Sequence, residues 1–293
     1  MGRSLADGFA PARATFEQAD RALGFPLSQL CFEGPAKTLQ LTENMQPALL
    51  TVSVAASRVL EEQNVEPDYV AGHSLGEYAA LVAAKSLAFS DAVRLVRKRG
   101  QYMQEAVPAS EGAMAALLKL PLEKLDSILA EASQGEIVTA ANINSPVQVV
   151  IAGHVGAVSR AVELARAAGV KRAIMLPVSA PFHCPLMEPA QERLAADLDL
   201  TQFRDLAVPL VNGWQAQVVR SGTEAREGLY QQVPNPVRWT EVIQKLVSLG
   251  AGRFIEVGAG GVLTGLLRSI DRGLEGSKFG EAQDLERVHA ALV

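Results

Sequence analysis

The pentapeptide GHSLG at positions 72–76 fits the G-x-S-x-G pattern, in which a serine is presented as a nucleophile. An apolar segment, 69–71, precedes it and predicts a strand, and the alanine-rich segment 75–85 predicts a helix. In this context the glycines allow a tight turn that exposes Ser74, and the backbone N–H of Leu75 points to where an oxyanion would form. The alternative is a serine that only caps a helix. The strand, turn and helix around Ser74 favour the nucleophile.

A nucleophilic serine needs a general base, and the chain contains four histidines: His73, His154, His183 and His289. The side chain of His73 diverges from that of Ser74 on the turn. His154 lies in an expected turn before a helix, where a surface role is the simpler interpretation. His183 lies in the segment 179–185, whose two prolines fix the backbone of a loop that must hold a side chain in position.

His289 offers a second pairing for the serine. It is near the C-terminal end of the sequence, where hydrolases with the chain order Ser, Asp, His place their histidine, and Asp271 or Asp284 would orient it. Spacing favours His183 over His289 as the base for Ser74, but both histidines stay candidates. A serine carboxylesterase or thioesterase that pairs Ser74 with His289 is therefore a competing hypothesis. It predicts transfer to water and no preference for a free carboxylate on the substrate.

The helix predicted from Ser90 to about residue 106 carries an arginine, Arg99, at the centre of its apolar face. At about 100° per residue, the apolar residues that lie within about 60° of it are Ala92, Leu95, Val96, Met103 and Ala106. A guanidinium there must meet a carboxylate, because an unpaired buried charge is very costly. The partner is either an acidic residue of the chain or a carboxylate of the substrate, which Arg99 would bind bidentately beside Ser74.

Composition and charge narrow the class of protein. The 293 residues include 27 Lys plus Arg and 32 Asp plus Glu, and the net charge of −5 argues against nucleic-acid binding, which needs a concentrated basic surface. The hydrophobic fraction of 48% is typical of a globular protein with a large core. No run of about 18 uncharged apolar residues is present, so we expect no membrane partner. Residues 1–7 lack the apolar region of a secretory signal.

The cysteine count bears on metals and on the cellular compartment. Cys31 and Cys184 are too few for a disulfide framework or for a zinc site without several histidines. We therefore expect no metal, and the cytoplasm is the expected compartment. The length predicts one large domain or a domain with an insertion, because single cores stop growing at roughly 250 to 300 residues. A monomer is the expected state.

Most of the chain predicts an α/β fold. Helices are expected at 14–23, 46–60, 75–85, 90–106, 190–198, 240–249 and 262–270, and strands at 69–71, 208–211 and 253–257. Ser90 is the expected N-cap of its helix. Alternating strands and helices predict a parallel sheet covered on both faces.

The segment 109–179 differs from the rest of the chain in the order of its expected strands and helices. Its expected elements are strands at 113–118, 137–141, 148–152 and 172–178 and helices at 122–132 and 157–168. In chain order this is βαββαβ, the ferredoxin-like arrangement. We interpret 109–179 as a small domain inserted into a larger, discontinuous domain made of 1–108 and 180–293.

Several further segments carry a family resemblance. In chain order they are QPAL at 46–49, AGHSLGEY at 71–78, RG at 99–100, MQ at 103–104, NINSP at 142–146, FHC at 182–184, NPV at 235–237 with Trp239, and EVG at 256–258 with LTG at 263–265. With Ser74, Arg99 and His183 they closely resemble the malonyl-CoA:acyl carrier protein transacylases of bacterial fatty-acid synthesis. As an ordered set they are far more specific than G-x-S-x-G alone.

The resemblance implies a role for each site residue. Ser74 would be the nucleophile, His183 its base, and Arg99 the residue that binds the malonyl carboxylate. A backbone carbonyl at Gln232, instead of an aspartate, would orient the histidine. Leu75 would donate one oxyanion-hole N–H, and Leu75, Met103 and Phe182 would line the acyl pocket. The implied fold is an α/β-hydrolase-like domain with a parallel sheet and a ferredoxin-like insertion.

The same resemblance implies the reaction. A malonyl group would pass from malonyl-CoA to Ser74 and then to the phosphopantetheine thiol of acyl carrier protein, with ping-pong kinetics. The coenzyme A thioester is a substrate, and no bound cofactor is implied. Acyl carrier proteins are acidic, so a local basic patch is expected, with Lys171 and Arg172 as candidates.

The sequence departs from the family at its start. Family members begin with an apolar strand and a loop rich in Gly and Gln that supplies a second oxyanion-hole N–H, and residues 1–13 contain nothing equivalent. Loss of one such donor costs about 10²- to 10³-fold in turnover. We therefore expect a chain that includes this segment to be more active. A further alternative is a catalytically weakened protein that still binds acyl carrier protein.

Overall fold

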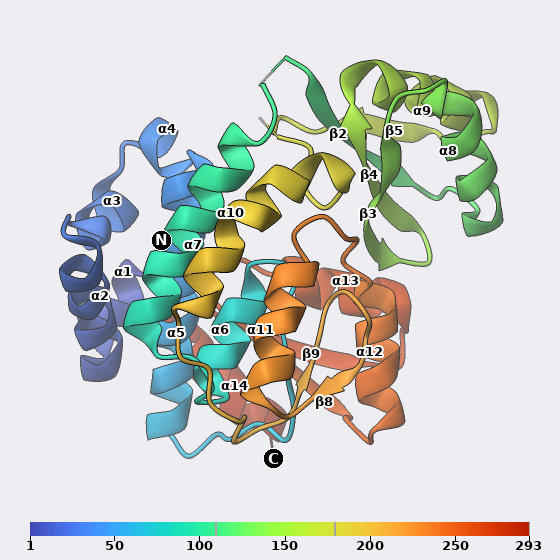
Figure 1. Cartoon of the computed structure of the whole chain (residues 1–293). Coiled ribbons are helices and arrows are strands. Elements are labelled where there is room, and N and C mark those ends of the chain that lie inside the picture. Colours follow the sequence, from blue (N-terminus) through green and yellow to red (C-terminus); the bar gives the residue numbers. More distant parts are fainter. Residues whose placement is uncertain (109, 179, 293) are drawn as a thin grey trace.

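The computed structural model describes residues 1–108, 110–178 and 180–292. It has the α/β architecture that the alternation of segments predicts (Figure 1). The chain up to residue 108 and after residue 180 forms the larger part of the molecule. The segment between them forms its own sheet at the upper right of Figure 1.

Helices make up most of the first hundred residues. They are α1 (Arg3–Gly8), α2 (Ala10–Leu23), α3 (Leu27–Glu33), α4 (Ala36–Leu39), α5 (Thr42–Glu62), α6 (Gly76–Ala83) and α7 (Phe89–Glu105). Helix α5 packs against α2, α6 and α7, and apolar side chains from these helices, such as Leu50, Leu81 and Val96, form the main core. As predicted, α2 ends at Gly24, whose φ of 74° is accessible to glycine at little cost.

The strands of this larger part are short. They are β1 (Val70–Ala71), β6 (Leu210–Val211), β7 (Val218–Val219), β8 (Arg253–Val257) and β9 (Glu275–Phe279). Strands β1 and β6 pair in parallel, β7 joins β6 antiparallel, and β8 pairs with β9 in parallel. Strands β7 and β9 are absent from the elements that the sequence predicts. The segment of β9, EGSKF, has the low β-propensity that makes such a strand hard to predict.

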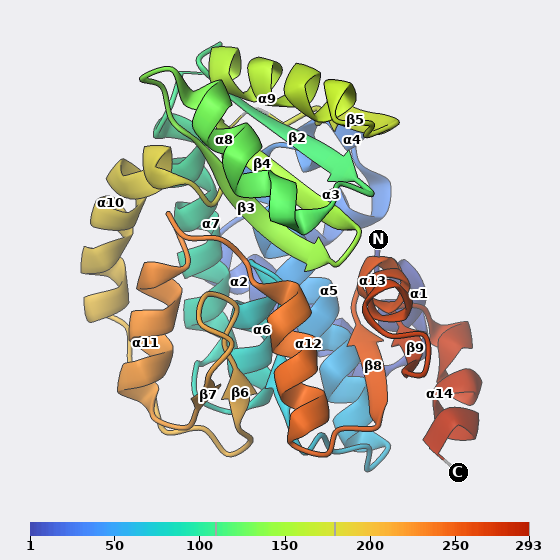
Figure 2. The same cartoon turned by 90° about the vertical axis from the view of Figure 1, so that its right-hand side faces the viewer.

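Further helices from the second half of the chain pack on these strands and on the helices of the first half. They are α10 (Glu188–Asp199), α11 (Gly222–Gln231), α12 (Trp239–Ser248), α13 (Val262–Ile270) and α14 (Leu285–Leu292). Helix α10 packs on α7 and α11, α11 also contacts α6, and α12 contacts β6. Figure 2 shows α11 and α12 beside the strands β6 and β7. These contacts bring α6, α7 and α11 together although they are far apart in the sequence.

The separate sheet has the element order expected for 109–179. Its elements are β2 (Gly112–Leu118), a 3₁₀ turn (Leu122–Lys124), α8 (Leu125–Ser133), β3 (Val138–Ser145), β4 (Gln148–His154), α9 (Val155–Ala167) and β5 (Arg172–Met175). The strand order is β3-β4-β2-β5, and every pairing is antiparallel. The expected boundary residues 109 and 179 lie outside the described residues, so the domain division stays an interpretation.

Strand β2 shows how this sheet joins the rest of the molecule. Ala115 and Leu117 pack with α8 and α9 in one apolar cluster, whereas Met114 and Ala116 belong to another cluster that includes Cys184. Alternate side chains of a strand point to opposite faces. One face of the sheet is therefore covered by its own helices and the other packs on the segment that carries His183. Figure 2 shows α8 and α9 on the side turned away from the larger part.

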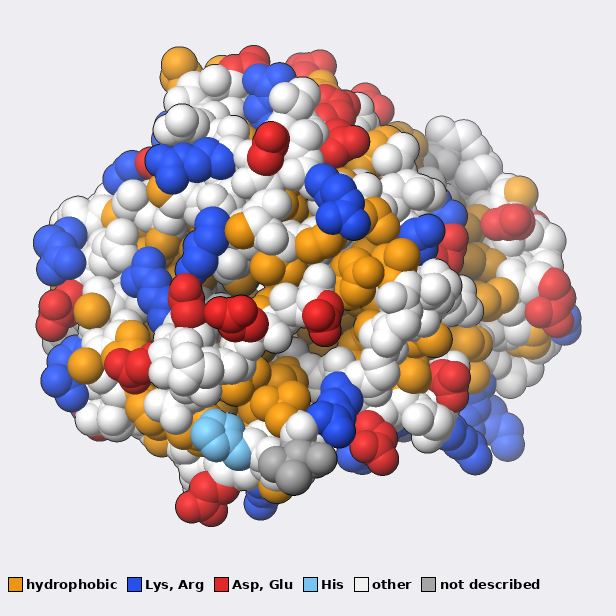
Figure 3. Space-filling view, turned by 90° about the horizontal axis from the view of Figure 1, so that it is seen from below, with side chains coloured by type: hydrophobic (Ala, Val, Ile, Leu, Met, Phe, Trp, Pro, Cys, Tyr) orange, Lys and Arg blue, Asp and Glu red, His pale blue; other side chains and the backbone are white. Residues whose placement is uncertain are grey.

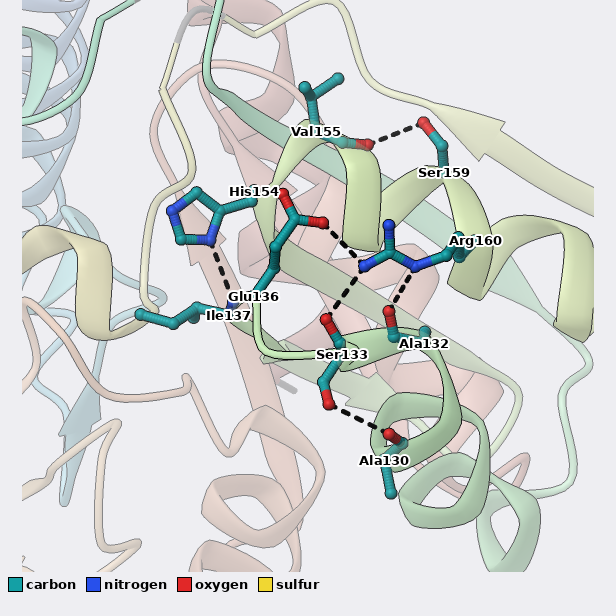
Figure 4. A network of polar contacts seen from close by, with 9 residues as sticks. All are labelled: Ala130, Ala132, Ser133, Glu136, Ile137, His154, Val155, Ser159 and Arg160. Atoms are coloured by element: carbon teal, nitrogen blue, oxygen red, sulfur yellow. Dashed lines mark hydrogen bonds and ion pairs between the residues drawn. The ribbon is translucent and has the colours of Figure 1, made fainter.

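A polar network ties α8 to α9, and Figure 4 shows it. The Arg160 guanidinium of α9 donates to the carbonyl oxygens of Ala132 and Ser133, at 2.7 and 2.9 Å, and contacts a Glu136 carboxylate oxygen at 2.7 Å. It thereby satisfies carbonyls that the end of α8 leaves free. His154 accepts a 2.9 Å hydrogen bond from the Ile137 N–H at Nδ1. A surface role is predicted for this histidine from the sequence. In the structure it is half-buried, and its ring accepts a hydrogen bond from the residue before β3.

The start of α7 differs from the prediction. Ser90 had been expected to cap this helix, but the helix begins at Phe89, and Ala88 occupies the cap position without a side-chain hydrogen bond. Phe89 is buried in the main core. Tertiary packing of that ring has therefore set the first turn two residues earlier than local capping preference does.

Charged side chains are interspersed on the surface. Figure 3 views the molecule from below, and on that face basic and acidic side chains alternate around areas of hydrophobic side chains. Within the part of the chain that the structure describes, no helix combines the length and the apolar character needed to cross a membrane.

Candidate active site

Ser74 lies at a sharp turn between β1 and α6. Its φ is +52°, in the left-handed region that a residue with a side chain rarely adopts. Gly72 makes the turn possible, because a Cβ at that position would lie 1.9 Å from the Gly76 carbonyl carbon and 2.1 Å from the Glu77 nitrogen. The G-x-S-x-G pattern thus corresponds to a strained strand-to-helix turn that presents the serine hydroxyl.

The histidine beside this serine is His183. Ser74 Oγ lies 2.7 Å from His183 Nε2, and His183 Nδ1 lies 2.8 Å from the backbone carbonyl oxygen of Gln232. A carbonyl oxygen only accepts hydrogen bonds, so Nδ1 carries the proton and Nε2 is free to accept from the serine hydroxyl. The three residues form the chain of hydrogen bonds that a serine nucleophile and its base require.

Burial keeps this histidine neutral. His183 is 3% exposed, and burial, followed by the nearby positive charge of Arg99, lowers the pKa of its imidazole from 6.5 to about 3. The ring is therefore unprotonated at neutral pH and available as a base. Its own φ of +60° shows that the loop before the 3₁₀ turn Pro185–Met187 holds it in an unusual backbone conformation.

Arg99 is buried next to the serine, on α7. It is 2% exposed, and its guanidinium donates to Gln46 Oε1 at 2.7 Å, to Gln232 Oε1 at 3.0 Å and to Ser74 Oγ at 3.1 Å. Its Nε has no hydrogen-bond partner among the described residues, and none of their carboxylates lies within ion-pair distance of the guanidinium. Burial lowers the pKa of Arg99, and the charges of Tyr78 and of the buried Glu77 oppose this shift. The site therefore presents a desolvated cation beside a nucleophile, a setting in which a substrate carboxylate binds strongly.

The remaining predicted residues lie around this group. Met103 is 1% exposed on α7, with its sulfur 4.0 Å from the Gln46 side-chain nitrogen. Leu75 and Phe182 are partly buried against the main core, next in sequence to Ser74 and His183. The backbone N–H of Leu75 has no hydrogen-bond acceptor among the described residues, as an oxyanion donor requires.

Three polar residues join the site without having been assigned a role from the sequence. Gln46 binds Arg99, Asn144 Oδ1 lies 2.8 Å from His73 Nε2, and Glu77 accepts hydrogen bonds from Gln232 and Gly213. Glu77 offered a usable signal, because it lies one helical turn beyond Ser74 and so shares its side of the helix start. Gln46 and Asn144 lie in the family segments QPAL and NINSP, but nothing local pairs them with Arg99 and His73, since these partners come from distant segments.

The alternative base is elsewhere in the fold. His289 is exposed on α14, which contacts β9, and it has no contact with Ser74 among the described residues. Asp284 accepts hydrogen bonds from the N–H groups of Gly280 and Glu281, and Asp271 accepts one from Gly273. These carboxylates stabilise local turns. In residues 1–108, 110–178 and 180–292, no cluster of three or more His, Cys, Asp or Glu has the geometry of a metal site.

A serine, a neutral histidine and a buried arginine on an α/β fold define an acyl-transfer enzyme. Residues 1–286 match the family model for the acyl transferase domain, and the chain belongs to this acyl transferase family. Among its relatives is the malonyl CoA-acyl carrier protein transacylase of Bacillus subtilis strain 168, which is 45% identical over 287 residues, 98% of this chain and 90% of the relative. The family predicted from the motifs is confirmed.

Solved structures agree with this assignment. An acyl carrier protein S-malonyltransferase from Vibrio cholerae superposes with a TM-score of 0.96 at 43% identity, covering 98% of this chain and 94% of that one. A structure of a type II PKS acyl-carrier protein in complex with its malonyl-transacylase gives the same TM-score and identity, covering 100% and 94%. The predicted α/β fold class is thereby confirmed.

Proposed function

We propose that this chain transfers a malonyl group from malonyl-CoA to the phosphopantetheine thiol of acyl carrier protein through a malonyl ester on Ser74. The observation that carries the proposal is the position of Arg99, a buried cation 3.1 Å from the Ser74 hydroxyl that forms no ion pair with any carboxylate in the described part of the chain. A malonyl group supplies the missing carboxylate and a thioester carbonyl close to it. The names of the relatives and of the solved structures support the same reaction.

The first half-reaction loads the enzyme. His183 Nε2 takes the hydroxyl proton as Ser74 Oγ attacks the thioester carbonyl carbon, and the backbone N–H of Leu75 stabilises the oxyanion. The carbon–sulfur bond then breaks, and His183 returns the proton to the leaving coenzyme A thiolate. Arg99 holds the distal carboxylate, so the reacting carbonyl stays at the serine.

The second half-reaction unloads it. The thiol of the carrier protein's phosphopantetheine gives its proton to His183, and the resulting thiolate attacks the ester carbonyl. Ser74 Oγ leaves and recovers the proton from His183. The Gln232 carbonyl holds the same imidazole tautomer in both directions, because the proton on Nδ1 never moves.

The proposed function also assigns roles to residues around the site and on the surface. Met103 and Phe182 are the expected walls of the acyl pocket, and the exposed Lys171 and Arg172 are the expected contacts for an acidic carrier protein. No bound cofactor or metal takes part in the proposed steps. A monomeric state, the cytoplasm as compartment and a small domain over 109–179 are the expected setting.

Intact mass after incubation with malonyl-CoA or acetyl-CoA, without carrier protein, tests the proposal. We expect a malonyl adduct on the wild type, little acetyl adduct, and no adduct on the Ser74→Ala variant. His183→Ala should load much more slowly, whereas His289→Ala should match the wild type. Absence of a malonyl adduct on the wild type contradicts the proposal. Equal loss in His289→Ala would revive the esterase alternative.

A further inference from the structure

Behind the site lies a fully buried glutamate, Glu77, for which the proposed steps have no use. It is 0% exposed on the first turn of α6. Its Oε2 accepts hydrogen bonds from the Gly213 N–H at 3.0 Å and from Gln232 Nε2 at 3.1 Å, and its Oε1 has no hydrogen-bond partner among the residues that the structure describes. Burial of a carboxyl group is costly. A residue that only fills space would not need one here.

Gln232 connects this carboxyl group to both catalytic partners of the serine. Its side-chain oxygen accepts from Arg99, its side-chain nitrogen donates to Glu77, and its backbone carbonyl accepts from His183. Gln232 is 2% exposed at the end of α11. Apart from Ser74, whose hydroxyl lies between them, no other described residue forms hydrogen bonds with both the arginine and the histidine.

The acceptor at Glu77 favours one orientation of the Gln232 amide. An amide has a donor end and an acceptor end, and a carboxyl oxygen attracts the NH₂ group. The Gln232 NH₂ donates to Glu77 at 3.1 Å and lies 3.5 Å from the Ser74 carbonyl oxygen, so the amide turns its oxygen to the Arg99 guanidinium. The reversed amide would place two sets of N–H donors against each other and leave buried donors unpaired.

We infer that Glu77 is a positioning residue for malonyl selection: its hydrogen bond to Gln232 holds the amide oxygen on Arg99 and so holds the guanidinium where it meets the malonyl carboxylate. The inference rests on the proposed function. The surrounding backbone supports it, because Cβ atoms placed on Gly213 and Gly228 would lie 3.2 and 3.4 Å from the Glu77 carboxylate oxygens. The carboxyl group is thus closely enclosed, with Oε2 directed at Gln232.

Hydrogen bonding, and not charge, is the property that matters in this arrangement. Both hydrogen bonds to the Glu77 carboxyl group are accepted by Oε2, and an acid that carries its proton on Oε1 keeps them. Burial raises the pKa of Glu77 to about 7, so both protonation states occur near neutral pH. A neutral amide in the same place, with its oxygen at the Oε2 position, would preserve the same bonds.

Two variants separate bonding from charge. Glu77→Gln keeps length and acceptor and loses the charge, whereas Glu77→Asp keeps the charge and is one methylene too short to reach both Gly213 and Gln232. We measure kcat/KM for malonyl-CoA and for acetyl-CoA loading by intact mass, together with thermal stability. Asp284→Asn is the matched control, since Asp284 is another buried acid, 3% exposed, whose hydrogen bonds go to backbone N–H groups away from the site.

We expect Glu77→Asp to lose malonyl loading about tenfold or more, mainly through KM, with acetyl loading changed less than about threefold, because a misdirected guanidinium affects only the acyl group that carries a carboxylate. Glu77→Gln should stay within about threefold of wild type in selectivity, a difference well below the value of such a bond. Asp284→Asn should lose stability only, with its malonyl-to-acetyl ratio unchanged.

Other outcomes overturn the inference. A selective loss in Glu77→Gln but not in Glu77→Asp would assign the role to charge, and equal losses for both acyl groups would make Glu77 purely structural. If Glu77→Asp does not fold, Glu77→Gln decides: retained selectivity supports the inference and lost selectivity overturns it. A wild type without any malonyl adduct overturns the proposed function and the inference together, whereas a loaded wild type with an equally selective Glu77→Asp overturns the inference alone.

Discussion

Ser74 and His183 both have positive φ angles, +52° and +60°. Such conformations cost a residue with a side chain roughly 1–3 kcal/mol and persist only where the surroundings hold them. Here they place Oγ 2.7 Å from Nε2. The third residue, Arg99, is positioned by amide oxygens and the serine hydroxyl instead of by a carboxylate. The binding energy of that cation is therefore left for a substrate.

Arg99→Lys tests this arrangement. Lysine keeps the charge but lacks the planar fork that reaches Gln46 and Gln232 together. We expect kcat/KM for malonyl-CoA to fall about 10- to 100-fold, the value of one hydrogen bond to a charged group, and acetyl-CoA loading to be spared. Arg97→Lys is the control on the same helix, where the guanidinium lies over the Phe25 ring and binds Asn44. Equal loss for both acyl groups in Arg99→Lys would contradict a carboxylate-binding role.

At the scale of elements, the site depends on one turn. Strand β1 contributes only Val70 and Ala71, yet its parallel partner β6 fixes the point from which the chain turns into α6. The two glycines of the motif differ sharply within this turn. A Cβ on Gly72 would collide with backbone at 1.9 Å, whereas a Cβ on Gly76 would meet nothing within 4 Å. Only the first glycine is demanded by packing.

Gly72→Ala and Gly76→Ala should therefore behave in opposite ways. Backbone cannot move aside cheaply at Gly72, so we expect a loss of stability above about 3 kcal/mol, or failure to fold, together with loss of the malonyl adduct. Gly76 lies in the first turn of α6, where alanine is the better helix former, so its variant should match or exceed wild-type stability by up to about 1 kcal/mol. Urea unfolding of both variants checks this, and a Gly76→Ala variant as unstable as Gly72→Ala would refute it.

For the whole molecule, folding buries two titratable groups in one site and shifts their pKa values in opposite directions. Burial raises the pKa of Glu77 from 4.5 to about 7 and lowers that of His183 from 6.5 to about 3. Arg99 and Tyr78 are the other ionisable groups that face Glu77, and the arginine opposes the rise. Below pH 4.5 the protonated Glu77 makes its full contribution to the free energy of unfolding. This contribution is lost as pH rises through about 7. The buried imidazole has the opposite trend between pH 3 and 6.5.

Comparison of the wild type with Glu77→Gln isolates the glutamate, because both proteins share the His183 contribution. The wild type should lose stability relative to the variant as pH rises from 4.5 to 7, by about tenfold in the unfolding equilibrium constant per pH unit, or about 3 kcal/mol in total. Above pH 7 the difference should level off. Urea unfolding at pH 5, 6, 7 and 8 provides the measurement, and a difference that does not vary with pH would contradict a raised pKa.

Local patterns were sufficient for much of the fold. The helical period predicted α2, α5, α7, α12 and α13, and α2 ends at the predicted glycine. The βαββαβ order of the smaller sheet was predicted in full. By contrast, β7 consists of two residues only, and the segment of β9, EGSKF, has low β-propensity, so neither strand is recognised from its own residues. The cap at Ser90 was predicted wrongly because burial of Phe89 outweighs a local hydrogen bond.

Residue types and spacing by themselves determined that Ser74 follows a strand and starts a helix, that Arg99 faces the core, and that the chain has the ordered motifs of its family. Those properties are local, so periodicity and turn chemistry encode them. Only the tertiary structure decided that His183 and not His289 meets the serine, that Arg99 has amides for partners, and that Glu77 lies behind Gln232. Each of these contacts joins elements distant in sequence, and the packing of α6, α7 and α11 sets their distances.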